Sequence, residues 1–366
     1  MRSLDLFSGC GGMAYGLRHA CTTVAYCDVR LQCRLSLQDS FRRGYLDLAP
    51  IYCDVTDLPD SLPEFDVLCA GFPCKNISGM GDRTGLQGKY SGLLKHAIDV
   101  VERRLPSYVM LENVANICSM PGVWRYLLQR LDCLGYDANW TTLSAADVGA
   151  LHKRNRWFFL AKKRGVRATA VSAPRAVLLP EEPQRFERMT PCDTLKARHR
   201  LTMLGNVCVP QQAATAWRFL MQWELWNKGT PCAQPLDLLA RMPTCGAVRQ
   251  GRVYKCRALP KPFACRDADI TLVPRDTGPT NQRLAKRVTK PLTLKRWATP
   301  RACMGLAPSG HRTGIAKNLT VRSKNDIQTQ VRFEKSTVDG FQRRLVNPLW
   351  LEQLMGLPPH FTDYTE

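Results

Sequence analysis

The stretch SLDLFSGCGGMAYG, residues 3–16, places an apolar strand, a glycine-rich loop and the start of a helix in immediate succession. Glycines in such a loop let the backbone approach a ligand closely and expose the N-terminus of the following helix to it. A dinucleotide-binding loop has the form G-x-G-x-x-G. Here Gly9, Gly11 and Gly12 give G-x-G-G, and the next glycine is Gly16. Many nucleotide-binding and adenosyl-binding folds share a first glycine loop, so this stretch predicts a class of folds and no single cofactor.

The first 163 residues alternate short apolar runs with segments of helical apolar spacing. The runs typical of strands are 3–7, 22–27, 66–72, 107–113 and 156–163. The spacing predicts helices over 93–105, 122–135 and 210–226. This alternation favours an α/β fold with a doubly wound, mostly parallel sheet that binds its ligands at the carboxyl ends of the strands.

Acidic residues follow two of the early apolar runs. Asp28 ends the run AYCD, at the place where an acid can bind ribose hydroxyls, and Asp54 follows the apolar pair at 51–52. Either aspartate alone is more typical of a cap or a turn. Together with the glycine loop, the three strand-end signals predict an adenosyl cofactor.

The composition limits the class of protein. The chain has 52 Lys and Arg against 31 Asp and Glu, a formal net charge of +21, which favours a nucleic-acid partner. A membrane surface is the weaker alternative, because no long basic amphipathic helix is evident. No apolar run reaches the ~20 residues of a membrane span. The start of the chain lacks the apolar run of a signal peptide, so we expect an intracellular protein, in a cytoplasm or a nucleus.

The 16 cysteines are irregularly spaced and include no C-x-x-C pair. Structural zinc sites normally contain such pairs, so we expect no metal. A disulfide framework suits small secreted domains, and we therefore expect reduced thiols.

The charge is unevenly distributed along the chain. Residues 229–346 hold 23 Lys and Arg against 7 Asp and Glu. We divide the chain into a catalytic and cofactor-binding core (1–163), a linker or irregular excursion (164–200), a segment that returns to the core (201–228) and a basic region (229–366). The last region reads as a small irregular lobe or a partly disordered tail. The lobe is favoured, because 345–361 predicts an amphipathic helix that needs a packing partner.

The stretch GFPCKNISGMGD, residues 71–82, places Cys74 after a proline in a glycine-rich loop. Most of the 16 cysteines are expected to be small buried apolar residues, and Cys74 is either one of these or a nucleophile. Downstream, LENV (111–114) ends a predicted strand with an acid and an amide. HKRNR (152–156) places Arg154 and Arg156 on one face of a strand, because side chains alternate.

In this order the motifs resemble those of the cytosine-C5 DNA methyltransferases, especially the short bacterial and phage-like branch. The matching segments are DLFSGCGG (5–12), GFPCKNIS (71–78), LENV (111–114), HKRNR (152–156) and LGNVCVPQQAA (204–214). The resemblance implies a class I, Rossmann-like fold and a smaller target-recognition lobe. It also implies double-stranded DNA as partner and S-adenosyl-L-methionine as cofactor. We expect a monomer; the resemblance indicates neither a restriction endonuclease partner nor a target sequence.

The resemblance also assigns catalytic roles. Cys74 adds as a thiolate to carbon 6 of a flipped-out cytosine, which makes carbon 5 nucleophilic enough to take a methyl group. Glu112 contacts N3 and the exocyclic amine of the base, and Asn113 holds the Cys74 loop. Arg154 and Arg156 form the family's arginine pair, with Arg156 at the cytosine O2. The base that removes the C5 proton is not indicated.

Cofactor contacts are implied at positions that match the family motifs, with Phe7 lying against the adenine. These positions are Phe7, Gly9, Gly11, Asp28, Val29, Asp54, Val55, Phe72, Leu93 and Asn206.

Three departures from the family pattern stand out. His152 replaces a glutamine of many relatives, and Val207 replaces a small polar residue of some. The basic region follows the GN segment, whereas target recognition precedes it in many members. Because VNPLWLEQLMGLPPHF (346–361) resembles the family's LxGFP segment, we interpret 229–366 as a relocated target-recognition region.

Three other functions are alternatives to DNA cytosine methylation. A transfer-RNA cytosine methyltransferase shares the catalytic residues, but its Cys-Phe-Thr segment is missing here. A catalytically silent DNA-binding relative typically loses the cysteine, the glutamate or the cofactor loop. A nicotinamide oxidoreductase accounts for the glycine loop and not for the other motifs.

Overall fold

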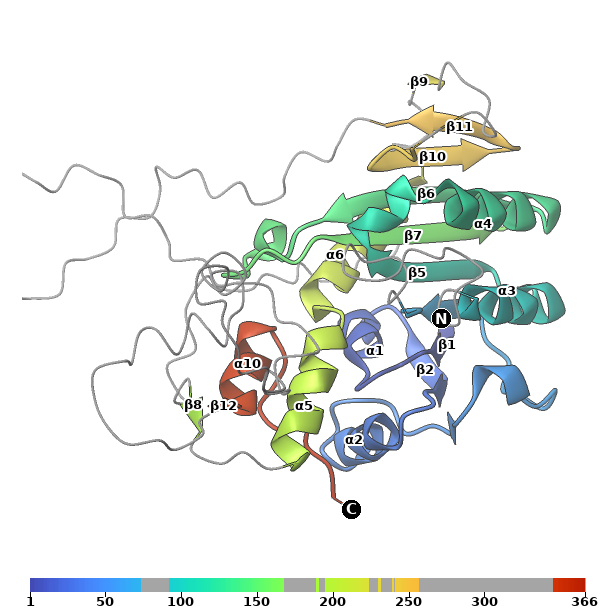
Figure 1. The fold of residues 1–366 in the computed structure, drawn as a ribbon. Helices are drawn as coiled ribbons and strands as arrows, with labels where there is room; N and C mark the ends of the chain where they lie inside the picture. Colours follow the sequence, from blue (N-terminus) through green and yellow to red (C-terminus); the bar gives the residue numbers. More distant parts are fainter. Residues whose placement is uncertain are drawn as a thin grey trace, which may run out of the picture.

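The computed structural model describes residues 1–73, 92–167, 189–190, 195–223, 230–231, 239, 241–256 and 345–365. Its centre is a 10-stranded sheet with the order β3-β2-β1-β4-β5-β7-β6-β10-β11-β9 (Figure 1). The strands are β1 (Arg2–Leu6), β2 (Thr22–Cys27), β3 (Ile51–Tyr52), β4 (Val67–Ala70), β5 (Tyr108–Val114), β6 (Tyr136–Leu143), β7 (Arg156–Lys163), β9 (Thr230–Pro231), β10 (Cys245–Arg249) and β11 (Arg252–Lys255).

Strands β1 to β6 run in one direction, and β7 inserts antiparallel between β5 and β6. The central strands read as continuous apolar runs because both of their faces are covered. In β4, Leu68 and Ala70 join the core on one face, while Val67 and Cys69 join the core on the other. The predicted α/β fold with a doubly wound, mostly parallel sheet is confirmed.

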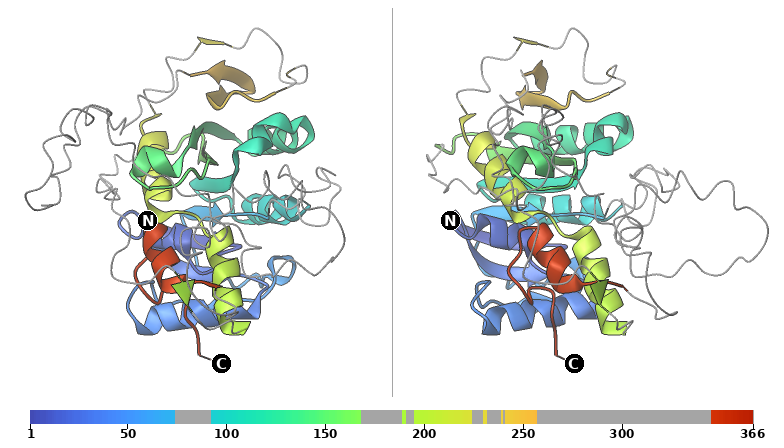
Figure 2. Two further views of the ribbon diagram at one scale, coloured as in Figure 1. Left: turned by 60° about the vertical axis from the view of Figure 1, so that its left-hand side comes forward. Right: turned by 90° about the vertical axis from the view of Figure 1, so that its left-hand side faces the viewer.

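Helices form a layer on each face of the sheet. α3 and α4 pack on one face, and α1 and α6 pack on the other, where α2 and α5 adjoin them near β2 (Figures 1 and 2). The helices are α1 (Gly12–Leu17), α2 (Leu31–Arg42), α3 (Leu93–Arg104), α4 (Pro121–Cys133), α5 (Leu195–Asn206), α6 (Pro210–Leu220) and α10 (Pro348–Leu354), with short 3-10 turns at Val55–Asp57, Ala115–Ser119 and Ala145–Val148. Within the described ranges, no helix combines the length and apolarity that crossing a membrane requires.

Within residues 1–163, the predicted strands and helices lie within two residues of the observed ones. The helix predicted over 210–226 is wrong in extent, because α6 ends at Leu220. α2 was not predicted, and neither was β6. Its sequence YDANWTTL contains polar residues that interrupt the apolar run. Asn139 is fully buried there because its amide donates to Leu220 O (2.9 Å) and its Oδ1 accepts from Arg249 Nη2 (2.6 Å). A buried amide that is satisfied in this way costs the fold little, and a pattern of apolar residues does not reveal it.

The described parts of 164–200 and 229–366 lie against the catalytic core. α5 begins at Leu195, inside the predicted linker, and residues 245–255 form a hairpin that extends the core sheet beyond β6. β12 (Leu345–Val346) pairs with β8 (Met189–Thr190). Residues 257–344 lie outside the described residues, and the division into four regions stays a prediction.

The helix predicted over 345–361 is wrong in extent. α10 covers only Pro348–Leu354, after an N-cap in which Asn347 Oδ1 accepts from Leu349 N at 3.0 Å. Gly356 has a φ of 72°, which ends the helix, and Pro358 and Pro359 follow. The chain then runs as an irregular tail to residue 365.

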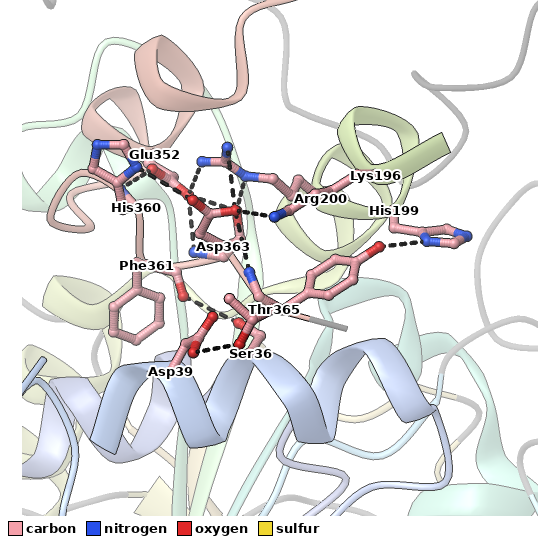
Figure 3. Close-up of polar contacts among 12 residues, drawn as sticks. Ser36, Asp39, Lys196, His199, Arg200, Glu352, His360, Phe361, Asp363 and Thr365 are labelled. Carbon is pink, nitrogen blue, oxygen red and sulfur yellow. Dashed lines mark hydrogen bonds and ion pairs between the residues drawn. The ribbon is translucent and has the colours of Figure 1, made fainter. Parts of the chain in front are cut away.

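This C-terminal segment, residues 345–365, is fastened to α2 and α5 by buried polar groups (Figure 3). Glu352 is fully buried and pairs with Arg200 of α5 (Oε1–Nη2, 2.9 Å). The same carboxylate accepts from the backbone N–H groups of Thr362 (2.8 Å) and His360 (2.7 Å). Ser36 of α2 donates to Phe361 O (3.1 Å). The end of the chain is therefore part of the core that carries the glycine loop.

Gly12, at the start of α1, permits close contact between α1 and the connection that leads into α6. A Cβ at this position would lie 2.3 Å from Val207 Cγ2 and 2.6 Å from the backbone oxygen of Cys208. Because the second contact is backbone, we expect Gly12→Ala to lower the free energy of unfolding by about 1–3 kcal/mol. Urea denaturation measures this loss.

Gly122 in α4 supplies the matched control, since a Cβ there has no neighbour within 4 Å. Gly122→Ala should raise stability by roughly 0.5–1 kcal/mol through helix propensity and chain entropy. Equal midpoints for the two variants would contradict the tight packing at Gly12.

Candidate active site

The glycine loop between β1 and α1 turns through left-handed backbone. Phe7, Gly9 and Gly11 have φ values of 55°, 59° and 87°. At Gly11 a Cβ would also lie 2.4 Å from Leu46 Cδ1, so this position requires glycine. At Gly9 the one atom within 4 Å of a Cβ is Arg30 Nη2 at 3.8 Å. The loop is thus closed against the protein at Gly11 and open to a ligand at Gly9.

Asp28 closes this loop from the end of β2. Its Oδ2 accepts from Gly9 N (2.8 Å), and its Oδ1 accepts from the backbone N–H of Arg30 (2.9 Å). The Arg30 side chain also pairs with this carboxylate (Nε–Oδ1, 3.3 Å). Asp28 therefore acts as a turn residue, which is one of the two roles that the sequence predicts for it. Its carboxylate holds Gly9 in place.

Asp54 has a similar local role after β3. Its Oδ1 accepts from the backbone N–H (2.9 Å) and the hydroxyl (2.8 Å) of Thr56. These hydrogen bonds lower the pKa of the Asp54 carboxyl. The residues that follow the two acids differ, because Val55 is buried while Val29 is 70% exposed.

Four of the predicted cofactor positions meet in one apolar cluster at the carboxyl edge of the sheet. Val55 and Phe72 are buried in the core between the sheet and α3, and Phe7 and Leu93 pack against it, partly exposed. Asn206 lies apart from this cluster, exposed at the end of α5, with its amide donating to Thr202 O (3.1 Å). The structure thus joins the strand-end positions and leaves Asn206 on a separate element.

Glu112 occupies the end of β5 with little exposure. Its Oε1 lies 2.8 Å from Arg156 Nε as an ion pair, outside good hydrogen-bond alignment, and its Oε2 is next to Gly71. Burial raises the pKa of the Glu112 carboxyl, and Arg156 and Arg154 partly offset this. A carboxyl whose pKa is raised in this way beside an arginine is suited to give and take a proton.

Asn113 connects this strand end to the loop that contains Cys74. Its amide donates to Phe72 O (3.2 Å), and its Oδ1 accepts from Val114 N (2.8 Å). Phe72 and Pro73 lead directly into Cys74, which lies outside the described residues. Asn113 therefore fixes the chain two residues before the predicted nucleophile.

The two arginines of HKRNR do not share a strand face as predicted. β7 begins at Arg156, and Arg154 precedes it. Arg154 is only 1% exposed and donates from Nη2 to Gly205 O (3.0 Å) and Val207 O (2.7 Å), which holds the turn between α5 and α6. Because a turn precedes the strand, the two side chains point to different partners. Arg156 faces Glu112, whereas Arg154 binds the backbone of the GN segment at Gly205 and Val207. Burial and Arg154 lower the pKa of His152 to about 3, which leaves its imidazole neutral.

Two polar residues of this site were missed from the sequence. Gln212 is fully buried, and its amide donates to Leu143 O (3.0 Å) and Arg154 O (2.7 Å), tying α6 to both ends of the β6–β7 connection. Asp5 is buried beneath the glycine loop. Asp5 lies within DLFSGCGG and Gln212 lies within LGNVCVPQQAA. Their position among residues with assigned roles is the signal that could have identified them. In the part of the chain that the structure describes, no group of three or more His, Cys, Asp or Glu could hold a metal ion.

Comparison with known proteins gives consistent matches. The model of the family described as C-5 cytosine-specific DNA methylase matches residues 1–207. The Type II methyltransferase M.CviJI of Paramecium bursaria Chlorella virus IL3A is 28% identical, across 99% of this chain and 98% of that protein. M.NlaIV of Neisseria lactamica is 28% identical over 43% of this chain and 40% of the relative, and M2.BsuMI of Bacillus subtilis is 30% identical over 44% and 42%. The chain thus spans less than half of these two bacterial relatives.

Proposed function

The chain belongs to the C-5 cytosine-specific DNA methylase family, and on that premise we propose that Cys74 and Glu112 act together on one cytosine of duplex DNA. The observation that carries this proposal is the geometry at the end of β5. Glu112 is paired with Arg156 at 2.8 Å, and the next residue, Asn113, holds Phe72 just before Cys74. A carboxyl and a guanidinium are thereby brought to one strand edge, and the neighbouring Asn113 holds the chain two residues before Cys74.

The cofactor of the family is S-adenosyl-L-methionine, and the residues present fit it. The open loop at Gly9 allows close approach, and the apolar cluster around Phe7, Val55 and Phe72 offers a surface for the adenine. Asp28 has a carboxylate at the end of β2 for the ribose. When bound, S-adenosyl-L-methionine supplies an electrophilic methyl group. Phe7, Gly9, Gly11, Asp28, Val29, Asp54, Val55, Phe72, Leu93 and Asn206 are proposed to contact it.

Each catalytic group has a defined proton or electron-pair role. The Cys74 thiolate adds to carbon 6, and the electron pair of the 5,6 double bond makes carbon 5 nucleophilic. Glu112 gives a proton to N3 as negative charge develops there, and Arg156 binds O2. After carbon 5 is methylated, its proton leaves to a base, the double bond re-forms, Cys74 is expelled as a thiolate, and N3 returns its proton to Glu112.

The target cytosine has to leave the DNA helix, because a base that is stacked inside a duplex does not reach a catalytic site at the edge of the protein's sheet. Flipping costs a few kcal/mol, which phosphate contacts offset. The chain's net charge of +21, concentrated in 229–346, supports a DNA affinity that falls steeply with salt. We propose that 229–366 contributes target recognition, and that the enzyme acts as a monomer inside the cell that holds its DNA.

The decisive test is transfer of tritium from methyl-labelled S-adenosylmethionine to mixed-sequence duplex DNA, followed by digestion to nucleosides. We expect label in 5-methyldeoxycytidine and none in a parallel reaction with transfer RNA. Label confined to RNA would replace the DNA substrate. The absence of label in both, from folded protein that binds the cofactor, would indicate a silent relative.

Glu112→Gln is expected to lower kcat about 10²–10³-fold, because the amide keeps the shape and loses the transferable proton. The Kd for the cofactor should change little, since Glu112 faces Arg156 and the base. Steady-state kinetics with saturating DNA measures the change. Glu64→Gln, at a carboxylate that is 76% exposed and paired with Arg104, is the matched control and should keep full activity.

A further inference from the structure

Asp5 is a buried acid that the catalytic scheme does not use. It lies near the end of β1 (Arg2–Leu6), directly before the glycine loop, and is 1% exposed. Its Oδ2 is buried and has no hydrogen-bond partner among the residues that the structure describes. The Ser8 hydroxyl beside it donates to the backbone oxygen of Asp5 (2.6 Å). A buried carboxyl oxygen left unsatisfied next to a ligand loop calls for a partner that arrives with a ligand.

The described surroundings of Asp5 hold acids and neutral groups. Tyr26, Cys27 and Asp28 lie on the β2 side, Cys69 lies on β4, and Cys208 lies between α5 and α6. Arg30, which stands at the start of α2 and reaches toward Gly9, is paired with Asp28. Of the two acids under the loop, Asp28 is thus neutralised by the protein and Asp5 is not.

The physical consequence is a carboxyl that keeps its proton near neutral pH. Burial, reinforced by the charge of Asp28, raises the pKa of Asp5 to about 8. A cation placed beside the carboxyl would reverse this, because opposite charge favours ionisation. S-adenosyl-L-methionine has two cationic groups, an ammonium and a sulfonium. The glycine loop is its proposed binding site.

We propose that Asp5 is the counter-ion for the positive charge of the methyl donor, and that its proton is released to solvent when the donor binds. This inference rests on the proposed function only for the identity of the cofactor. The carboxylic O–H bond breaks, the proton goes to the buffer, and the carboxylate stays beside the bound cation. No redox step is involved.

Calorimetry at pH 6.5 tests the release, where the amino group of the free cofactor is protonated. Titration in two buffers of different ionisation enthalpy gives the number of protons exchanged. We expect close to one proton released per S-adenosylmethionine by the wild type and none by Asp5→Asn. The wild-type Kd should also fall about tenfold per pH unit between pH 5.5 and 7, whereas the variant's Kd stays flat. Asp60→Asn, at a carboxylate that is 99% exposed, should behave as the wild type.

S-adenosylhomocysteine separates the two cationic groups, since it has the ammonium and lacks the sulfonium. Release with both ligands assigns Asp5 to the ammonium, and release with S-adenosylmethionine alone assigns it to the sulfonium. Binding without proton release, or the same release from Asp5→Asn, would overturn the counter-ion. No binding at all would overturn the cofactor assignment and the linkage with it.

The stability of the cofactor-free protein provides a second readout. A carboxyl whose folded pKa lies above its unfolded value of about 4 destabilises the fold progressively as pH rises from about 4 to 8. Asp5→Asn, which is neutral throughout, should therefore gain stability relative to the wild type over this range. A constant difference between the two proteins would show that Asp5 is already ionised and overturn the proposal.

Discussion

Replacing Cys74 with serine is expected to lower methyl transfer to duplex DNA by about 10³-fold or more. The hydroxyl of serine does not ionise near neutral pH, whereas a cysteine thiol ionises readily where positive charge lowers its pKa. Without the attack at carbon 6, carbon 5 of cytosine is too weak a nucleophile to take the methyl group. Tritium counting on DNA, combined with cofactor calorimetry on the same sample, measures the loss at unchanged cofactor affinity.

Cys53 supplies the control, because it is an exposed free thiol on the loop after β3. Cys53→Ser should retain wild-type transfer rates. DNA that contains 5-fluorocytosine adds a direct readout, since the fluorine blocks the final elimination and leaves the base bonded to the enzyme. Peptide mapping of that adduct should place it on Cys74. An adduct on another cysteine would contradict the assignment.

Removing the charge of Glu352 should destabilise the whole protein, by about 3–5 kcal/mol. In Glu352→Gln the Arg200 guanidinium, only 11% exposed, stays buried, loses its nearer anion and keeps the more distant Asp363 (Nη1–Oδ1, 3.9 Å). One amide group also faces the N–H groups of Thr362 and His360, which it cannot both accept as the carboxylate does (Figure 3). Urea denaturation measures the loss, and limited proteolysis should show earlier cleavage of residues 345–365.

The exposed pair Glu102–Arg130 offers a matched comparison. Its members are 48% and 40% exposed, so Glu102→Gln should change stability by less than about 1 kcal/mol. In the double variant Glu352→Gln with Arg200→Met, the loss of stability should be smaller than the sum of the two single losses, because the buried cation that has lost its nearer anion is gone. Strict additivity would mean that the ion pair does not hold the C-terminal segment to α5.

The sequence was most informative where chemistry and backbone geometry coincide. Gly11 could be predicted from its place in the glycine loop, and its φ of 87° and the 2.4 Å that would separate a Cβ from Leu46 Cδ1 explain why glycine is required there. Glu112 could be predicted because it ends a strand whose apolar run is continuous. Arg154 was placed on the wrong element, since the period-two pattern of a strand extends into the turn before Arg156 and does not mark where the strand begins.

Long-range packing was the part that no local pattern contained. The pairing of β6 with β10, the docking of 345–365 on α2 and α5, and the burial of Glu352 join residues far apart in the chain. A short helix such as α10 is stabilised by those distant contacts, which is why its predicted length was wrong.

By itself, the sequence determined the α/β fold, the glycine loop, and the family to which the motif order belongs, because spacing and residue type set local backbone geometry and chemistry. Only the tertiary structure decided that Arg156 rather than Arg154 faces Glu112 and that Asp28 is paired with Arg30. It also decided that Asp5 lies beneath the loop without a paired cation among the described residues. These are properties of burial and of charges brought together from different strands. They arise when the sheet closes, and no single segment of the chain contains them.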